Sequence, residues 1–386
     1  MSASSIRGLR ITSVHLENWR NFRDVEVALS GRVFLIGPNA SGKSNFLDVF
    51  RFLQDLVSIG GGFQDAVRKR GGVSRVRCLA ARRNPHIRIR ICLGDDDQPA
   101  AWEYDLRFTQ DNRRRPLIVQ EVVRHEGEQV LQRPDGQDEE DPERLTQTYL
   151  EQVNANQRFR KVSEFLSSIR YLHLVPQIVR EPERSAGRTN DPFGGDFLEQ
   201  LAGVSATTLK SRLAAIREAL GVAVPQLKEI ELSRDSRGVA HLRGNFEHWR
   251  PHGAWQSEGD FSDGTLRLMG LLWAILEGSG PLLLEEPELS LHPAVVRHIP
   301  AMFQRMQRRS GRQVFTSTHS PELLSDAGIG LDDVLLLEPG AEGTTVKPAA
   351  EYEDIRELVA GGVPLPDTIM PRTAPSQAGH LSLFGG

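Results

Sequence analysis

Cysteine is nearly absent from the sequence. Only Cys78 and Cys92 occur among the 386 residues, and neither has a CxxC spacing or a histidine cluster around it. This scarcity argues against a structural disulfide and a zinc site, and it favours a reducing cytoplasm. The opening "MSASSIRGLR" also lacks the apolar core of a signal peptide, and no apolar stretch approaches membrane-spanning length. We therefore expect a cytoplasmic protein with no membrane partner.

The sequence has little excess charge of either sign. Its formal net charge is -4, with 25% charged and 39% hydrophobic residues, as in an ordinary soluble protein. This balance argues against a protein coated by nucleic acid, although the net charge does not reveal local basic patches. Basic clusters stand at residues 68–70, 82–83, 113–115 and 305–312. They are typical either of solvated faces or of a DNA-binding surface, and the charge balance leaves both interpretations open.

The pattern of apolar residues predicts an α/β protein without a long coiled coil. Alternating apolar residues in "ITSVHL" and "VEVAL" predict half-buried strands, and "RVFLI" predicts a fully buried strand. "HIRIRICLGDDDQPAAWEYDLRF" predicts a hairpin, residues 125–145 an exposed polar excursion, and residues 146–220 mostly helices. From Pro281 onward, the apolar runs "PLLL", "QVFTST" and "DVLLLE" alternate with helical stretches. No heptad repeat lasts long enough for a coiled coil.

A glycine-rich turn, "GPNASGKS", directly follows the predicted strand "RVFLI" and fits G-x-x-x-x-G-K-[ST] completely. Gly37 and Gly42 allow the backbone N–H groups to point at phosphates, and the positive end of the following helix adds to the field. Lys43 would bridge the β- and γ-phosphates, and Ser44 would bind Mg²⁺. The sequence therefore predicts a site for a nucleoside triphosphate, which we take to be ATP. Its residues are Gly37, Pro38, Asn39, Ala40, Ser41, Gly42, Lys43, Ser44 and Asn45.

Two carboxylates end a second buried strand, in "PLLLEEPELSLHP". Glu285 is predicted to hold Mg²⁺, directly or through water, and Glu286 to polarise the attacking water. The alternative is a pair of surface charges or a helix N-cap, which fits less well after a run of leucines. A third strand, "QVFTSTHS", ends near His319, whose side chain would meet the γ-phosphate. A purely structural histidine is the alternative there.

These motifs, with "DFSDGTLRLMGLLWAIL" and the opening "ITSVHLENWRNFRDVEVAL", resemble the ATPase heads of the SMC/RecF-like branch of the ABC superfamily. That branch includes bacterial ATPases grouped with AAA-type core domains. The resemblance covers roughly residues 10 to 60 and 255 to 340 at the level of motifs. It implies that Ser262, Asp263 and Gly264 form a signature loop, which reaches across a dimer to the γ-phosphate of the other subunit. Read without the family, "FSDGT" is also a plain N-capped helix.

The resemblance assigns further positions. Residues 289 to 292, "LSLH", match the loop that links the carboxylates to the dimer interface, and His319 matches the switch histidine. Gln54 and Gln64 are candidates for the family's glutamine loop, and neither is a clear match. Candidates to flank adenine, or else to pack in the core, are Trp19, Arg20 and Phe22.

The fold implied by the resemblance is an α/β P-loop ATPase head of the ABC type, with a mainly β N-terminal sheet and an inserted helical lobe. Nothing after residue 340 resembles the acidic nuclease module of some relatives, so we expect a minimal head. The expected division is 1–95 for the N-terminal half of the head, 96–255 for an inserted lobe with a hairpin and then helices, 256–365 for the C-terminal half, and 366–386 for a flexible tail.

The function implied by the resemblance is that of a Mg²⁺-dependent ATPase that closes as an ATP-sandwiched homodimer. We expect it to act on DNA in repair or genome maintenance, with an arginine-bearing surface against the DNA. The alternative is a regulatory ATPase of a defence-type system, whose closed dimer switches a separately encoded nuclease or other effector. A transporter subunit fits poorly, because the motif variants differ and no membrane partner is implied.

The tail, "APSQAGHLSLFGG", carries Leu381, Leu383 and Phe384 after a proline-bearing segment. Such a cluster predicts either a docking peptide or residues that fold onto the protein's own surface. "HLSLF" resembles the peptides, usually written QLSLF, with which bacterial replication and repair proteins hold the sliding clamp. His380 replaces the usual glutamine. The sliding clamp is thus a candidate partner.

Overall fold

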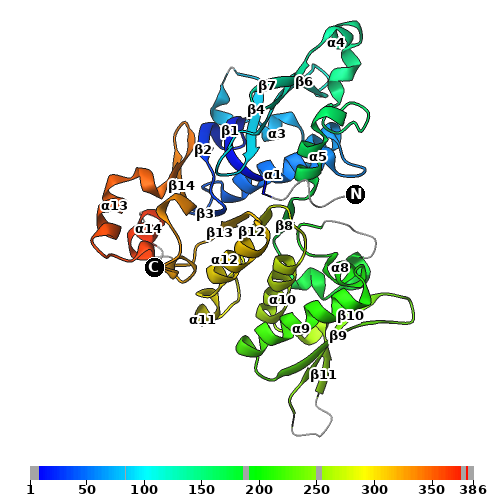
Figure 1. Cartoon of the computed structure of the whole chain (residues 1–386), viewed down its shortest axis with the longest axis vertical. Helices are drawn as coiled ribbons and strands as arrows, with labels where there is room; N and C mark the ends of the chain where they lie inside the picture. Colours follow the sequence, from blue (N-terminus) through cyan, green and yellow to red (C-terminus); the bar gives the residue numbers. More distant parts are fainter. Residues whose placement is uncertain (1–7, 83, 186–190, 249–253, 375–379, 381–386) are drawn as a thin grey trace.

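The computed structural model describes residues 8–82, 84–185, 191–248, 254–374 and 380. Its strands form three sheets, and helices pack between and beside them (Figure 1). No helix within these ranges is long and apolar enough to cross a membrane. Cys78 and Cys92 are both free thiols, and Cys78 is buried.

The first sheet is antiparallel and contains the N-terminal strands. Period-two alternation builds it, since Ile87, Ile89, Ile91 and Leu93 are buried whereas the intervening residues are half-exposed. In spatial order, the strands are β2 (Phe22–Ala28), β1 (Arg10–Trp19), β4 (Ile87–Gly94), β5 (Trp102–Gln110), β6 (Pro116–His125) and β7 (Glu128–Arg133). The predicted hairpin is β4–β5. It belongs to this sheet and not to an inserted lobe, because β4 pairs with β1 and pairing continues across the boundary expected at residue 95.

The polar segment at residues 125–145 is largely exposed, as predicted, but it is folded and buries two of its charged side chains. This segment contains β7 and the helix α4 (Gly136–Glu140), and it encloses the fully buried side chain of Arg133. The Arg133 guanidinium donates to Glu121 at 3.1 Å and to Asp138 at 2.7 Å. Both carboxylates are buried as well. This charged segment is therefore folded, because Arg133 and its two carboxylate partners pair inside the protein.

The second sheet is the α/β core and lies in the middle of the molecule (Figure 1). Its strands are parallel except for β15, and both faces are covered, which explains the continuous apolar runs in the sequence. In spatial order, they are β15 (Gly343–Pro348), β14 (Val334–Gly340), β3 (Arg32–Ile36), β13 (Val314–Ser317), β12 (Leu282–Glu285) and β8 (Arg170–Leu172).

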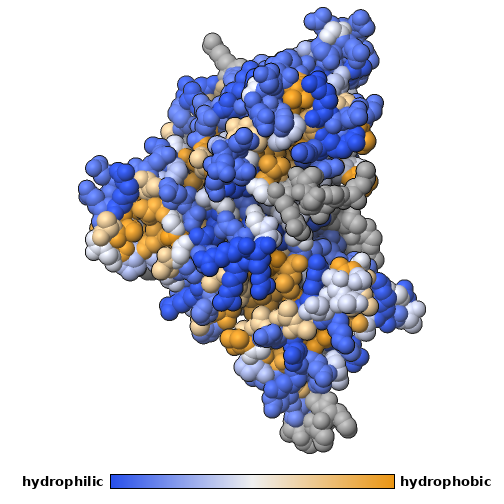
Figure 2. Space-filling model, in the orientation of Figure 1, coloured by the Kyte–Doolittle hydropathy of each residue, from blue (hydrophilic) through white to orange (hydrophobic). Residues whose placement is uncertain are grey.

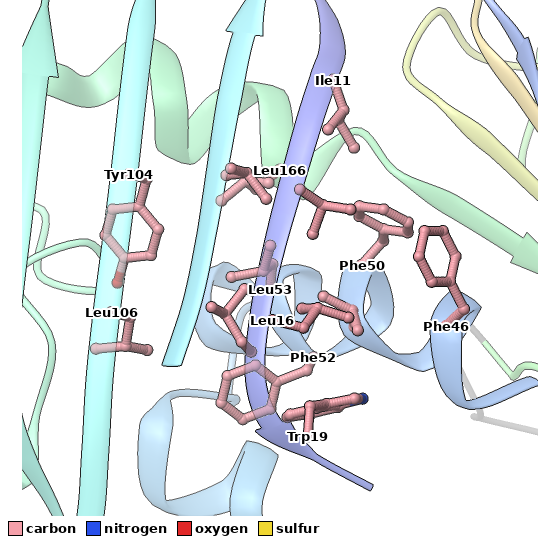
Figure 3. Close-up of a cluster of buried hydrophobic side chains, with 14 of the residues drawn as sticks. Ile11, Leu16, Trp19, Phe46, Phe50, Phe52, Leu53, Tyr104, Leu106 and Leu166 are labelled. Carbon is pink, nitrogen blue, oxygen red and sulfur yellow. The ribbon is translucent and has the colours of Figure 1, made fainter. Parts of the chain in front are cut away.

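Alternate residues of the central strands enter two different apolar layers. Leu35 packs in a cluster with the first sheet and with α1 (Lys43–Val57), whereas Phe34 packs with the helices on the opposite face. Figure 3 shows Phe50 and Leu53 of α1 among the side chains of the first sheet, close to Leu16. The helix is thus clamped between two sheets, which fixes the direction of its N-terminus.

The remaining elements cover the other face of the core and its edges. A third, three-stranded sheet, which the sequence analysis did not predict, contains β11 (Ala254–Ser257), β10 (Ala240–Phe246) and β9 (Leu227–Arg234). The other helices are α2 (Phe63–Lys69), α3 (Val73–Val76), α5 (Arg160–Ser167), α6 (Pro176–Val179), α7 (Pro182–Ser185), α8 (Phe197–Ala202), α9 (Ala206–Ala223), α10 (Asp263–Leu276), α11 (Pro293–Val296), α12 (Ile299–Ser310), α13 (Glu353–Ala360) and α14 (Leu365–Thr373).

The flexible tail expected from residue 366 begins in fact as a helix. Helix α14 buries Pro366, Thr368 and Ile369, so this part of the chain packs on the core. Figure 2 shows an apolar patch over α13 and α14, where Leu358 is exposed. The peptide predicted to dock on the sliding clamp lies outside the described residues, apart from His380, and stays a prediction.

Replacing Arg133 with methionine should lower the free energy of unfolding by about 3–5 kcal/mol, because Glu121 and Asp138 would remain buried without their partner. Urea denaturation followed by circular dichroism measures this. Arg124→Met is the matched control, since Arg124 pairs with Glu103 on a partly exposed surface and should cost less than about 1 kcal/mol. Equal losses in the two variants would contradict the assigned role of Arg133.

Candidate nucleotide-binding site

The candidate site lies where three adjacent parallel strands end. Strands β3, β13 and β12 are neighbours, and their carboxyl ends lead into the glycine-rich loop (residues 37–42), His319 and the glutamate pair. In open α/β sheets, ligands bind outside the carboxyl ends of the strands. The three motifs, which are far apart in the sequence, therefore meet at one edge.

Two glycines of the loop stand where no side chain fits. A Cβ on Gly37 would lie 2.5 Å from the carbonyl oxygen of Leu337, and one on Gly42 would lie 2.1 Å from the amide nitrogen of Asn21. Gly42 also has a φ of 100°, which side chains disfavour. The shape of the loop thus requires glycine at both positions.

Asn21, which the sequence analysis missed, holds the loop from the β1–β2 turn. Its Nδ2 donates to the carbonyl oxygen of Ser41 at 2.8 Å, and its Oδ1 accepts from the side chain of Asn45 at 2.8 Å. The buried hydroxyl of Ser41 has no hydrogen-bond partner in the described part of the chain. Because buried polar atoms are normally paired, this orphan fits a loop that closes on a polar ligand.

Lys43 turns back onto its own loop. Its Nζ donates to the carbonyl oxygens of Gly37 at 2.9 Å and Pro38 at 3.1 Å. Burial lowers the pKa of Lys43, whereas the nearby Glu286 and Glu285 oppose that shift. The ammonium group is therefore a partly desolvated cation beside two carboxylates, and an anionic ligand in the loop would offer it stronger partners than carbonyl oxygens.

Ser44 and Glu285 are in direct contact. The Ser44 hydroxyl donates to one oxygen of the Glu285 carboxylate, and the Tyr171 hydroxyl donates to the other. Burial and the charge of Glu285 raise the pKa of Tyr171, which keeps this hydroxyl a donor. Tyr171 lies on β8, next to β12, and the Arg51 guanidinium is 4.2 Å from its ring centroid. No sequence motif indicated Tyr171.

The Ser44–Glu285 pair suits a magnesium ion. No group of three or more His, Cys, Asp or Glu side chains that could hold a metal occurs in the ranges that the structure describes. Mg²⁺ needs no such cage, because it usually takes one or two protein oxygens and fills its shell with water and substrate phosphates. A hydroxyl and a carboxylate side by side, at the foot of a phosphate loop, match that donor set.

Glu286 and His319 face each other beyond this pair. The His319 Nε2 lies 3.7 Å from Oε1 of Glu286. Burial and Lys43 lower the pKa of His319, which favours the neutral imidazole at neutral pH, while Glu286 opposes this shift. The Glu286 backbone has a φ of 44°, and its N–H donates to the Ser317 carbonyl oxygen at 3.0 Å. A non-glycine residue held at positive φ is a strained backbone position of the kind that clusters at functional sites.

Glu288 is a third carboxylate that the sequence analysis did not single out. It accepts hydrogen bonds from the Thr318 hydroxyl and from the His319 N–H at 3.2 Å. Burial raises its pKa. The side chain thus fixes the turn that presents His319, and its only signal in the sequence was its place in "EEPELS".

The predicted signature loop does not meet the glycine-rich loop of the same chain. Ser262 caps the N-terminus of α10 with its hydroxyl, and a Cβ on Gly264 would lie 2.5 Å from the carbonyl oxygen of Ser290. Asp263 accepts from Arg180 at 2.6 Å. Across the described ranges, no hydrogen bond or ion pair links these residues to residues 37–45. Their role at a partner's site stays a prediction.

Neither candidate for the glutamine loop touches the glutamate pair. The Gln54 amide donates to the carbonyl oxygen of Ile169 at 2.7 Å. The Gln64 amide donates to the carbonyl oxygens of Pro116 and Thr146. Both side chains therefore serve as links between neighbouring segments of the N-terminal half.

Of the residues proposed to flank adenine, two pack in the core. Trp19 and Phe22 are fully buried, and the centroids of the Trp19 and Phe52 rings are 5.2 Å apart. Figure 3 shows these two rings next to each other. Arg20 is partly exposed and its guanidinium lies 3.4 Å from Asp48. The aromatic residues at the end of β1 and the start of β2 thus pack in the core of the first sheet.

The chain matches a known protein family over most of its length. A family model described as "AAA domain, putative AbiEii toxin, Type IV TA system" matches residues 32–325. The chain belongs to this AAA-domain family. No curated protein sequence shows a significant match to it. The matched range contains the glycine-rich loop, the glutamate pair and His319.

Solved structures show that this AAA-family chain has the fold of an SMC head. One is a SmcHead bound to the C-winged helix domain of ScpA, with a TM-score of 0.53 at 12% identity, covering 87% of this chain and 96% of that one. Another is an Smc head domain with an extended coiled coil bound to the C-terminal domain of ScpA, derived from Pyrococcus furiosus. It has a TM-score of 0.52 at 13% identity, covering 91% of this chain and 100% of that one. The predicted fold class and the resemblance to SMC-like ATPase heads are thus confirmed.

Replacing Gly42 with alanine should destabilise the loop by about 1–3 kcal/mol, because alanine would be held at a positive φ and against Asn21. Thermal unfolding and hydrogen exchange of residues 37–45 measure the effect. Gly221→Ala, in α9 with open space around its Cα, is the control and should be neutral or stabilising. A Gly42→Ala protein with unchanged exchange at the loop would contradict this account.

Proposed function

We propose that the protein binds and hydrolyses ATP with Mg²⁺, and that it closes as an ATP-bound homodimer that acts on DNA. The observation that carries the proposal is the meeting of Lys43, Ser44, Glu285, Glu286 and His319 at one edge of the central sheet. Membership of an AAA-domain family and the fold of an SMC head support an ATPase-type domain.

In this proposal, the N–H groups of residues 37–45 bind the phosphates. Lys43 leaves the carbonyl oxygens of its own loop and donates to the β- and γ-phosphates, where its charge is better matched. Ser44 and Glu285 hold Mg²⁺, which offsets the charge of the phosphates. Tyr171 keeps Glu285 oriented from the neighbouring strand.

Hydrolysis requires a base and a partner for the γ-phosphate. Glu286 takes the proton from the attacking water as the water oxygen bonds to the γ-phosphorus, and the bond to the bridging oxygen breaks to release ADP and phosphate. His319 lies close enough to Glu286 to donate to the γ-phosphate from the same side. Its lowered pKa favours a neutral imidazole, which has one N–H donor and does not bind Glu286 as a permanent ion pair.

Glu286→Gln should bind ATP and turn it over at least about 100-fold more slowly, because the amide keeps the shape and removes the base. Phosphate release with and without Mg²⁺, together with nucleotide binding by calorimetry, measures both properties. Glu140→Gln, on the exposed end of α4, is the control and should turn over normally. Undiminished turnover by Glu286→Gln would exclude it as the base.

The dimer places Ser262, Asp263 and Gly264 at the γ-phosphate of the partner subunit. ATP then favours the dimer by its higher affinity for the closed state. The N-terminus of α10, capped by Ser262, suits this role because its free N–H groups attract an anion.

In the Glu286→Gln background, ATP should produce a dimer in sedimentation at tens of micromolar protein, and Ser262→Arg should prevent it. Ser262→Asp is the sharper variant, since aspartate also caps a helix but would repel the partner's γ-phosphate. It should unfold like the parent protein and remain a monomer with ATP. Dimers in both Ser262 variants, or a parent that stays monomeric, would refute the arrangement.

A second candidate function is that of a regulatory ATPase of a defence-type system, which switches a separately encoded effector. The description of the matching family names a putative toxin of a type IV toxin–antitoxin system, and this description favours the second candidate. The two candidates share the ATPase site. They differ in what the closed dimer contacts, which is duplex DNA in the first and another protein in the second.

A further inference from the structure

A second hollow lies outside the candidate nucleotide site. Its volume is about 660 Å³, and none of the residues that line it belongs to the glycine-rich loop or to the glutamate pair. Its walls are α2 with the glycine pairs on both sides, the β5–β6 turn, and the segment that contains Gln147 and Glu151. We call it the arginine hollow, after Arg68, Arg113, Arg114 and Arg115 in its lining.

One wall is a rigid turn that carries three successive arginines. The Asp111 carboxylate accepts the backbone N–H groups of Arg113 and Arg115, each at 2.8 Å, and Arg114 has a φ of 64°. The Arg115 side chain is bound to Asp111 and Glu143. In the ranges that the structure describes, neither Arg113 nor Arg114 has a carboxylate within ion-pair distance, and both are exposed. The turn is thus fixed while two of its charges lack partners.

The facing wall offers backbone and polar groups. Arg68 of α2 is largely exposed and pairs with Asp65. A Cβ on Gly72 would meet no atom within 4 Å, so a ligand can approach the main chain there. Ser74 and Gln110 hydrogen-bond to each other across the hollow's edge. These backbone and side-chain donors can bind an anion, but they cannot distinguish one nucleotide sequence from another.

The electrostatic balance of the hollow is opposite to that of the whole chain. Among the described residues, four arginines and two carboxylates, Asp65 and Glu151, line it. Asp65 pairs with Arg68, and Asp111 and Glu143 pair with Arg115 from outside the lining. The positive excess therefore comes from Arg113 and Arg114, although the formal net charge of the protein is -4. Burial raises the pKa of Glu151 to about 7, so this carboxyl is partly protonated at neutral pH. The hollow is therefore a local positive site on a protein that is negative on average.

We propose that the arginine hollow binds the phosphate backbone of duplex DNA. Guanidinium groups match phosphate oxygens in pairs, and Arg113 and Arg114 are free to make such contacts. Proteins that hold single strands use exposed aromatic rings on which unpaired bases stack. Among the described residues that line the hollow, Phe63 is the only aromatic one, and its side chain is fully buried. The surface can therefore bind the phosphate backbone but has no exposed ring on which a base could stack.

This proposal deepens the DNA-acting part of the proposed function and uses none of its ATPase residues. It predicts that Arg113→Ala with Arg114→Ala binds a fluorescein-labelled duplex at least about tenfold more weakly at low salt, since two charge-assisted contacts are lost. The plot of log affinity against log salt, between about 50 and 200 mM, should be shallower by about 2, because each neutralised phosphate contributes about 0.9. Fluorescence anisotropy measures both quantities.

Arg308→Ala with Arg309→Ala is the matched control. These two arginines are adjacent, exposed and located at the end of α12, outside the hollow's lining. The control should keep the wild-type affinity and salt dependence, and both double variants should keep the wild-type ATP turnover measured without DNA. Retained turnover with lost DNA binding separates a failure of this surface from a failure of the ATPase site.

Three outcomes would overturn the proposal. The first is equal loss of DNA binding in the two double variants, or no loss in either. The second is tighter binding of a single strand than of the duplex. The third is displacement of the duplex by micromolar inorganic tripolyphosphate, which would indicate a small phosphorylated ligand in the hollow.

Discussion

Parallel pairing between β3, β13 and β12 is the interaction on which the candidate site depends. The N–H of Thr318 donates to Leu35 at 3.2 Å, and the N–H of Glu286 donates to Ser317 at 3.0 Å. The donors of these two hydrogen bonds, Thr318 and Glu286, are the first residues after β13 and β12, so the bonds continue the strand pairing up to the start of each loop. A slip of the register would move a glutamate or His319 away from Lys43 and would turn apolar side chains to the wrong layer.

The two apolar layers keep this register fixed. Each central strand places alternate residues in opposite clusters, and Leu283 of β12 enters one cluster while Leu282 and Leu284 enter the other. Such strands leave no solvated polar face along their length, and the polar residues Thr316 and Ser317 of β13 are buried near its carboxyl end. The chemistry is thus concentrated at one edge of the sheet by the same burial that stabilises the fold.

The sequence predicted the parts of the site that are local and missed those that depend on distant contacts. The glycine-rich loop, Glu285 and Glu286 follow buried strands directly, so strand prediction alone places them at one edge. Tyr171 and Asn21 gave no signal, because their contacts join residues that are 20 or more positions apart in the sequence. The polar stretch around Arg133 was misjudged since composition does not show that charges pair inside the protein. Gln54 and Gln64 were named by analogy, and their amides are bound elsewhere.

Neither glutamine candidate contacts the glutamate pair, and a different segment lies between the carboxylates and the predicted signature loop. On β8, Tyr171 donates to Glu285. Arg180, at the end of α6, donates to Asp263 and to the Phe261 carbonyl oxygen. The segment between these contacts also packs against α10, because Gly270 of α10 has no side chain where Leu174 lies. A Cβ there would be 2.2 Å from a methyl carbon of Leu174, so α10 and this segment are closely packed at that point. A continuous series of contacts thus runs from the Glu285 carboxylate through Tyr171, Leu174 and Arg180 to the N-terminal end of α10.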